Sequence, residues 1–227
     1  MFVSLQKTLR ISAWLAAATV LGMIAIFALT GVGQDPLQFI HPVEKYASLL
    51  LANPPALRAS VALDNFFIVL YSTVFLSLAA LLLRSGSPRV LVFGFLGLAL
   101  FLGLLDLLEN LHFFAMLARA EQGMLPSSLE IELQVWESLF KFHVGYLGLF
   151  LLGLALPRQQ RAARLLAQLL VFVQLPVGIL IYVTPPLVSL PLVFVRFSLF
   201  VAGLLLLAEA FGHEPAPLGA VGSGAPA

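Results

Sequence analysis

Two acids, an amide and an imidazole interrupt the apolar segment 90–117. They are Asp106, Glu109, Asn110 and His112. An ionisable group at membrane depth costs about 2.5 to 3.5 kcal/mol, so such groups are usually retained for a partner or a task. Carboxylates and imidazoles transfer protons, bind cations or hold polar ligands. The motif therefore predicts a functional site but does not indicate which reaction or ligand it serves.

Depth along the helices indicates which charges meet. A helix rises 1.5 Å per residue, so Asp106, counted from Arg89, and Lys141, counted from Arg158, both lie about 25 Å from the arginine-bearing boundary. Because the two are level, we predict an ion pair between them. Glu109 and Glu137 come out at about 30 Å, at the opposite edge of the membrane core.

Further polar residues share this half of the membrane. Asp64 lies near the same edge of the membrane core as Glu109, and Tyr71 and Arg196 lie about 20 Å from the arginine-bearing boundary. We predict a second ion pair between Asp64 and Arg196. Asp106 is expected to be the truly buried charge, whereas Glu109 approaches the rim. The predicted buried polar cluster comprises Asp64, Asn65, Tyr71, Asp106, Glu109, Asn110, Lys141 and Arg196, with His112, Glu137 and His143 at its rim.

One spacing in this segment is shared with a class of metal site. Glu109-x-x-His112 has the spacing of helical di-iron sites, but those sites need the motif twice together with further glutamates. A zinc ion bound by His112, His143 and a carboxylate would require a rotated helix. The chain has no cysteine, which excludes thiolate sites and a cysteine nucleophile. We assign no metal and no cofactor.

Composition identifies the elements that must position these residues. With a mean hydropathy of +1.04 and only 10% charged residues, the 227-residue chain is an integral membrane protein. Its net charge of +1 gives no case for nucleic-acid binding. We predict an all-α bundle of six transmembrane helices, each able to cross about 30 Å. The spans are expected at about 11–30, 64–83, 90–118, 129–156, 163–183 and 187–210.

Basic residues predict the orientation of the spans. With both termini cytoplasmic, seven basic residues near span ends face inward and three face outward. The inward set is Lys7, Arg10, Arg84, Arg89, Arg158, Arg161 and Arg164, and the outward set is Lys45, Arg58 and Arg119. We therefore expect a multi-pass protein of a bacterial inner membrane.

The connections carry their own signals. Residues 1–211 form one transmembrane domain, and 31–60 is an external loop whose middle, Pro42 to Ala52, forms a short interfacial helix with Tyr46 at headgroup level. Ser127-x-x-Glu130 is a capping box that starts the fourth span. Pro176 should kink the fifth span. The Gly, Pro and Ala-rich tail, 212–227, is expected to be disordered.

The polar residues also carry a resemblance. Asp64-x-x-Phe67-x-x-x-Tyr71, Asp106-x-x-Glu109-Asn110 and Lys141-Phe142 lie in three successive spans. Together they resemble a pattern in small, uncharacterised bacterial multi-pass membrane proteins. The resemblance covers about spans two to four and brings no activity with it. It implies only that these residues belong together.

Several functions remain open at this point. A non-catalytic membrane component, or a protein that binds a lipid or small molecule, fits a polar site that locks the bundle or holds a ligand. A membrane-embedded hydrolase or transferase acting on lipid, and a proton- or cation-coupled carrier, would use the same carboxylates. The expected partners are the lipid bilayer, a lipid or small-molecule ligand, and further subunits.

Overall fold

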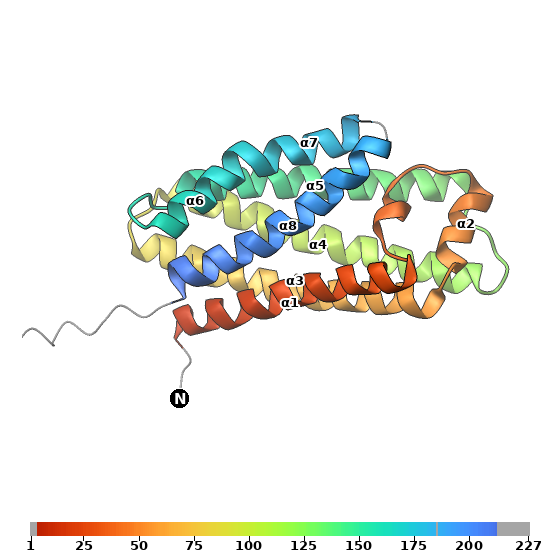
Figure 1. Ribbon diagram of the computed structural model, residues 1–227, viewed down its shortest axis with the longest axis horizontal. Coiled ribbons are helices and arrows are strands. Elements are labelled where there is room, and N and C mark those ends of the chain that lie inside the picture. The colour runs from red at the N-terminus through yellow and green to blue at the C-terminus, as the bar shows by residue number, and fades with distance from the viewer. Residues whose placement is uncertain (1–3, 185, 213–227) are drawn as a thin grey trace, which may run out of the picture.

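The chain folds into a bundle of long helices that run along a common direction (Figure 1). The structure is a computed structural model that describes residues 4–184 and 186–212. Within these ranges there is no strand, and six helical segments are long and apolar enough to cross a membrane. The predicted all-α class and the six spans are thereby confirmed. The predicted tail, 212–227, lies almost wholly outside the described residues.

The elements follow one another with short connections, and the fifth span combines α6, η2 and α7. In chain order they are α1 (Leu5–Thr30), the 3-10 helix η1 (Asp35–Gln38), α2 (Val43–Leu51), α3 (Pro54–Arg84), α4 (Arg89–Ala120), α5 (Ser128–Ala155), α6 (Arg161–Leu169), the π-helical stretch η2 (Leu170–Gln174), α7 (Leu175–Val183) and α8 (Pro186–Phe211).

Polar caps set where α3 and α5 begin. The Asn53 side chain accepts the N–H of Ala56 at 3.2 Å, and prolines occupy the first turn, so α3 starts at Pro54. The prediction of a start near residue 64 was too late because it followed the apolar run alone. The predicted cap of α5 is present, since Ser127 Oγ accepts the N–H of Glu130 at 3.2 Å.

The segment before α3 packs onto the bundle. The predicted short helix exists as α2, but Tyr46 is fully buried and donates its hydroxyl to the Leu37 carbonyl at 3.2 Å. Tyr46 therefore faces the protein, and its place at headgroup level stays a prediction. The apolar face of α2, which includes Leu50, covers neighbouring helices, whereas Lys45 remains exposed.

The fifth span is irregular one turn before its proline. A proline lacks the N–H of a helical hydrogen bond, and its ring meets the carbonyl four residues earlier. For Pro176 that carbonyl belongs to Phe172, which lies inside the π-helical stretch. The wide turn accommodates the proline, so the predicted distortion is placed in η2 and α7 begins at Leu175.

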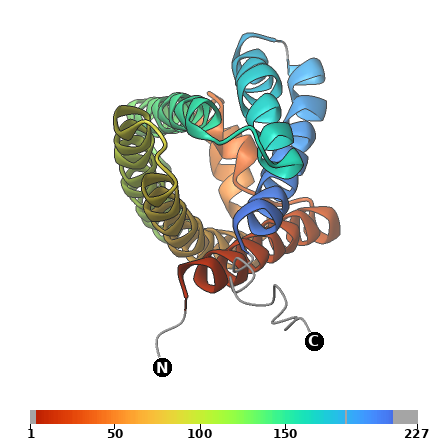
Figure 2. The same cartoon turned by 90° about the vertical axis from the view of Figure 1, so that its left-hand side faces the viewer.

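The six spans form a ring. Around it the neighbours are α1, α3, α4, α5, the fifth span and α8, and α8 packs back against α1 (Figure 2). α1 begins and α8 ends at the same end of the bundle, which we call the terminal end (Figure 1). The opposite end carries η1 and α2 and is called the α2 end.

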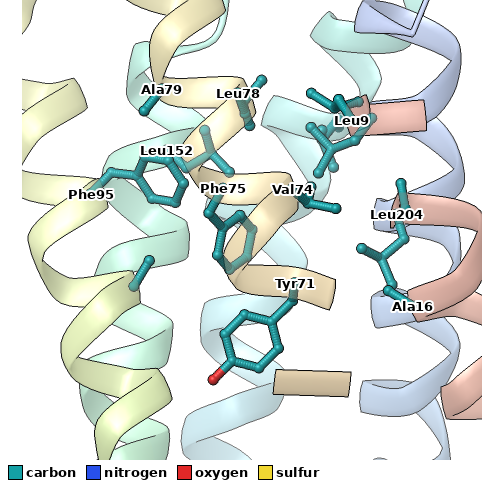
Figure 3. Packing of buried hydrophobic residues seen from close by; sticks show 14 of the residues in the cluster. Leu9, Ala16, Tyr71, Val74, Phe75, Leu78, Ala79, Phe95, Leu152 and Leu204 are labelled. Carbon is teal, nitrogen blue, oxygen red and sulfur yellow. The ribbon is translucent and has the colours of Figure 1, made fainter. Parts of the chain in front are cut away.

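Apolar packing joins the helices toward the terminal end. Phe75 and Phe95 meet edge to face with ring centroids 5.2 Å apart, and Leu152 and Leu204 belong to the same buried cluster. Tyr71 lies at the edge of this cluster, with its hydroxyl directed away from the apolar side chains (Figure 3). The cluster therefore supports the polar residues from one side.

Small residues let α4 and α5 approach closely. A Cβ atom at Gly145 would lie 3.2 Å from Leu102, and one at Gly148 would lie 3.3 Å from Leu98. Gly97 does not share this role, because a Cβ atom there would have no neighbour within 4 Å. The more restrictive contact, between Gly178 and Tyr146, was not predicted.

Candidate functional site

The centre of the candidate site is the Lys141 ammonium. Its Nζ lies 2.9 Å from Asp106 Oδ1, as the depth count predicts. The other oxygen of that carboxylate, Oδ2, accepts a hydrogen bond from the Tyr71 hydroxyl at 2.6 Å. The Lys141 side chain is 5% exposed and that of Asp106 14%. α3, α4 and α5 therefore meet through a buried ion pair and one hydrogen bond.

Glu109 is buried, which corrects its predicted place near the rim. Its side chain has no exposed surface, and its carboxylate accepts hydrogen bonds from Lys141 and from the Ser138 hydroxyl. Gln134, also buried, donates to Ser138 at 3.3 Å. α2 packs over this end of α4 and α5 and excludes the water that the prediction assumed.

Asp64 belongs to the same cluster, but its partner is not Arg196. Asn110 donates its Nδ2 to Asp64 Oδ2 at 2.7 Å and to Asn65 Oδ1 at 3.0 Å. Asn110 is almost fully buried. The three residues join α3 to α4 beside the Lys141 centre.

Arg196 forms its ion pair with Asp35, in η1. The Arg196 Nη2 to Asp35 Oδ1 distance is 2.6 Å, and Arg196 is 2% exposed. Its guanidinium lies 4.4 Å from the centre of the Phe142 ring, and Lys141 Nζ lies 4.8 Å from the same ring. Sequence reasoning missed Asp35 because it was counted as part of an external loop. Pro36 follows Asp35 in the first turn of η1, and a proline at this position could have indicated a short helix there.

The predicted rim residues divide into two groups. His112 Nδ1 lies 2.9 Å from Glu137 Oε2, and its Nε2 lies 3.7 Å from Glu130 Oε1, so this imidazole joins α4 to α5 at the α2 end. Glu130 also pairs with Arg119. His143 takes no part, because it is exposed and its ring nitrogen donates to the Leu139 carbonyl of its own helix.

Negative groups outnumber positive ones around Lys141. The carboxyl groups of Asp64, Asp106 and Glu109 surround a single ammonium among the described neighbours. Tyr46 covers this cluster. Burial raises the pKa of its phenol well above the usual range, and the charges of Glu109 and Glu137 raise it further. Tyr46 is therefore a neutral hydrogen-bond donor at physiological pH.

A cavity of about 770 Å³ lies inside the ring of helices, with walls from η1, α2 and every span. Its volume is within the range of about 300 to 1,000 Å³ typical of ligand pockets. The charged groups at its wall gather in the half toward the α2 end. They are Asp35, Lys45, Asp64, Asp106, Lys141 and Arg196.

The remainder of the cavity is apolar. Along α8 the wall continues from Arg196 to Leu207, a distance of about 16 Å toward the terminal end. Other side chains of the wall are also hydrocarbon or aromatic, among them Phe75, Leu152 and Leu166. One cavity thus combines a charged end with a long apolar end.

The geometry limits the chemistry that these residues support. Over residues 4–184 and 186–212, no three His, Asp or Glu side chains are grouped so that they would hold a metal ion. The Ser138 hydroxyl is engaged with Glu109 and lies outside the cavity wall. The arrangement holds polar groups by ion pairs and hydrogen bonds at one end of an apolar chamber.

Comparison of the chain with protein families, with curated proteins and with solved structures finds no match. The geometry of the cavity and its walls is therefore the basis for assigning a function.

Proposed function

We propose that this chain is a non-catalytic multi-pass membrane protein that binds one amphipathic lipid, or a similar small ligand, in its interhelical cavity. The observation that carries the proposal is the division of the cavity into a charged end, at Lys141 and Arg196, and an apolar end, at Leu204 and Leu207. A lipid is divided in the same way, into a polar head group and a hydrocarbon tail. Its hydrocarbon would lie against the apolar wall and its head group among the charges.

Lipid orientation in a membrane supports the same assignment. The charged end of the cavity lies in the outer half of the bilayer if the termini are cytoplasmic, as the basic residues at the terminal end favour. A lipid of the outer leaflet would then enter with its head group toward the α2 end. We propose a bacterial inner membrane as the location. Reporter domains fused to each terminus would test the orientation, and activity of an externally active reporter would contradict it.

Binding is tested by filling the apolar end of the cavity. Gly203 lines the cavity, and a Cβ atom there would meet Leu166 at an ordinary 3.7 Å. We expect Gly203→Leu to lower the affinity for a fluorescent lipid about tenfold, which corresponds to about 1.4 kcal/mol. The matched control is Gly97→Leu on the lipid-facing side of α4, which should bind as the parent protein does.

The measurement combines native mass spectrometry of the detergent-purified chain with fluorescence titration after lipid removal. One bound lipid per chain, displaced by Gly203→Leu alone, is the expected result. Absence of binding, or equal binding by both glycine variants, would overturn the proposal. Chemical conversion of the bound lipid, or substrate flux in proteoliposomes, would contradict its non-catalytic part and favour an enzyme or a carrier.

A further inference from the structure

The Arg196 end of the cavity contains polar atoms without partners. Arg196 donates from Nη2 to Asp35 and from Nη1 to the Tyr182 hydroxyl at 3.5 Å, but its Nε has no partner. Gln174 Nε2 is likewise buried and without a partner, and the buried Tyr146 hydroxyl, which lies beside Arg196, makes no hydrogen bond of good geometry. Both residues line the same cavity, and they are 2% and 3% exposed.

Buried polar groups in folded proteins are almost always hydrogen-bonded, so several incompletely hydrogen-bonded groups at one cavity wall indicate a ligand that completes them. Here each of the three groups can donate a hydrogen bond. The complementary ligand must therefore supply acceptor oxygens. Since one of the donors is a guanidinium, the strongest complement is an anionic oxygen group, which this planar cation can bind through two parallel hydrogen bonds.

The neighbouring charges also bear on the sign of the ligand. Arg196 and Lys141 flank the same ring, Phe142, so two cations stand close together at the cavity wall. Lys141 is already paired with Asp106 and Glu109, which belong to the helix beside it. Arg196 depends on Asp35, whose side chain is 26% exposed and comes from the short helix η1. Asp35 is thus the counter-ion that can most readily be replaced.

We infer that the Arg196 end of the cavity takes the anionic head group of an amphiphile, a carboxylate or a phosphate, which replaces Asp35 as the counter-ion of Arg196. Asp35 also lines the cavity, so a head group that reaches Arg196 meets its carboxylate. On replacement, Asp35 turns to water, and the free Nε, the Tyr146 hydroxyl and Gln174 gain acceptors. This inference depends on the proposed lipid-binding function and specifies its ligand class.

The test uses three probes with one hydrocarbon tail: oleate, oleyl phosphate and oleyl alcohol. Binding to the full, lipid-depleted chain is measured by competition with a neutral fluorescent lipid. We expect at least one acid to bind about tenfold more tightly than the alcohol. The tighter of the two acids identifies the head group. Equal affinity for both acids and the alcohol would overturn the inference.

Variants of the ion pair test the mechanism. Arg196→Gln should remove most of the preference for acids while leaving the affinity for the alcohol unchanged. Asp35→Asn should increase the affinity for the acids several-fold, because it removes the competing carboxylate. Arg58→Gln, which alters an exposed basic residue of α3 outside the cavity wall, is the matched control and should change neither affinity. An Asp35→Asn variant with unaltered acid binding would overturn the replacement of Asp35.

Tyr146→Phe provides a second route if Arg196→Gln does not fold. This variant removes only the hydroxyl and keeps the ring that packs on Gly178, so it should fold and bind acids more weakly. Unchanged acid binding by Tyr146→Phe would count against the inference. Failure of the inference and failure of the proposed function give different results. If the proposed function is wrong, no probe of any charge binds and Gly203→Leu has no effect. If only the inference is wrong, the alcohol and the acids bind equally well.

Discussion

Replacing Lys141 with methionine removes a buried cation that contacts both Asp106 and Glu109. Removing one partner of a buried ion pair typically costs about 3 to 5 kcal/mol, because the remaining charge has neither water nor a counter-ion. Methionine preserves most of the aliphatic volume, so the loss is chiefly electrostatic. With Glu109 fully buried and Asp106 14% exposed, we expect Lys141→Met to lower the free energy of unfolding by an amount in this range.

Second substitutions separate the contributions of the two carboxylates. Glu109→Gln removes the fully buried charge and keeps an oxygen that accepts from Ser138, so adding it to Lys141→Met should restore about half of the loss. Asp106→Asn should restore less of the lost stability. The Asp106 side chain is partly exposed, and in Lys141→Met its Oδ2 still accepts the hydrogen bond from the Tyr71 hydroxyl, at 2.6 Å in the parent protein. The ranking of the two double variants follows from burial.

The assay is reversible unfolding of the purified chain in mixed detergent micelles, followed by circular dichroism as the denaturing detergent is increased. Lys45→Met, at an exposed lysine, is the control and should change the unfolding free energy by less than about 0.5 kcal/mol. A cost below about 1 kcal/mol for Lys141→Met would refute the argument from a buried ion pair. Failure of Glu109→Gln to restore stability would refute the assignment of the larger penalty to Glu109.

Three further substitutions test the packing, a cap and the surface, each by the same unfolding measurement. Gly178→Ala would place a Cβ atom 2.4 Å from the Tyr146 ring, so it should cost about 1 to 3 kcal/mol, and a neutral effect would contradict this close approach. Ser127→Ala removes the cap of α5 and should cost about 1 kcal/mol; a change near zero would mean that the cap contributes nothing. Arg58→Met breaks the exposed pair with Glu121 and should cost at most about 1 kcal/mol, so a large loss would contradict its assignment as a surface pair.

The spans and the central ion pair could be predicted because both follow from regular helix geometry. An apolar run long enough to cross a membrane identifies a span, and the rise per residue places Asp106 level with Lys141. The first residues of the helices were harder to predict from the sequence. α3 begins at Pro54 through a polar cap, outside the apolar run on which the prediction was based.

The partners of Glu109 and Arg196 could not be predicted from depth, because depth gives height along a helix but not what covers it. Glu109 is buried because α2 folds back over its end of the bundle, and Arg196 meets Asp35 because η1 turns inward. Both contacts depend on how a connecting segment packs. The incompletely hydrogen-bonded groups of Tyr146 and Gln174 have no sequence signature, since only the cavity shows that they lack well-placed partners.

The closure of the ring between α1 and α8 makes the cavity depend on insertion of α8. Asp35 and Arg196 are 161 residues apart, and α8 supplies the wall from Arg196 to Leu207. Chains fold from the N-terminus as they are made, so α1 to α7 would be inserted before that wall arrives. We expect this intermediate to expose Lys141 and its carboxylates along an open side facing lipid. Insertion of α8 then converts an open trough into a closed chamber, so ligand binding would report that α8 has been inserted and packed against α1.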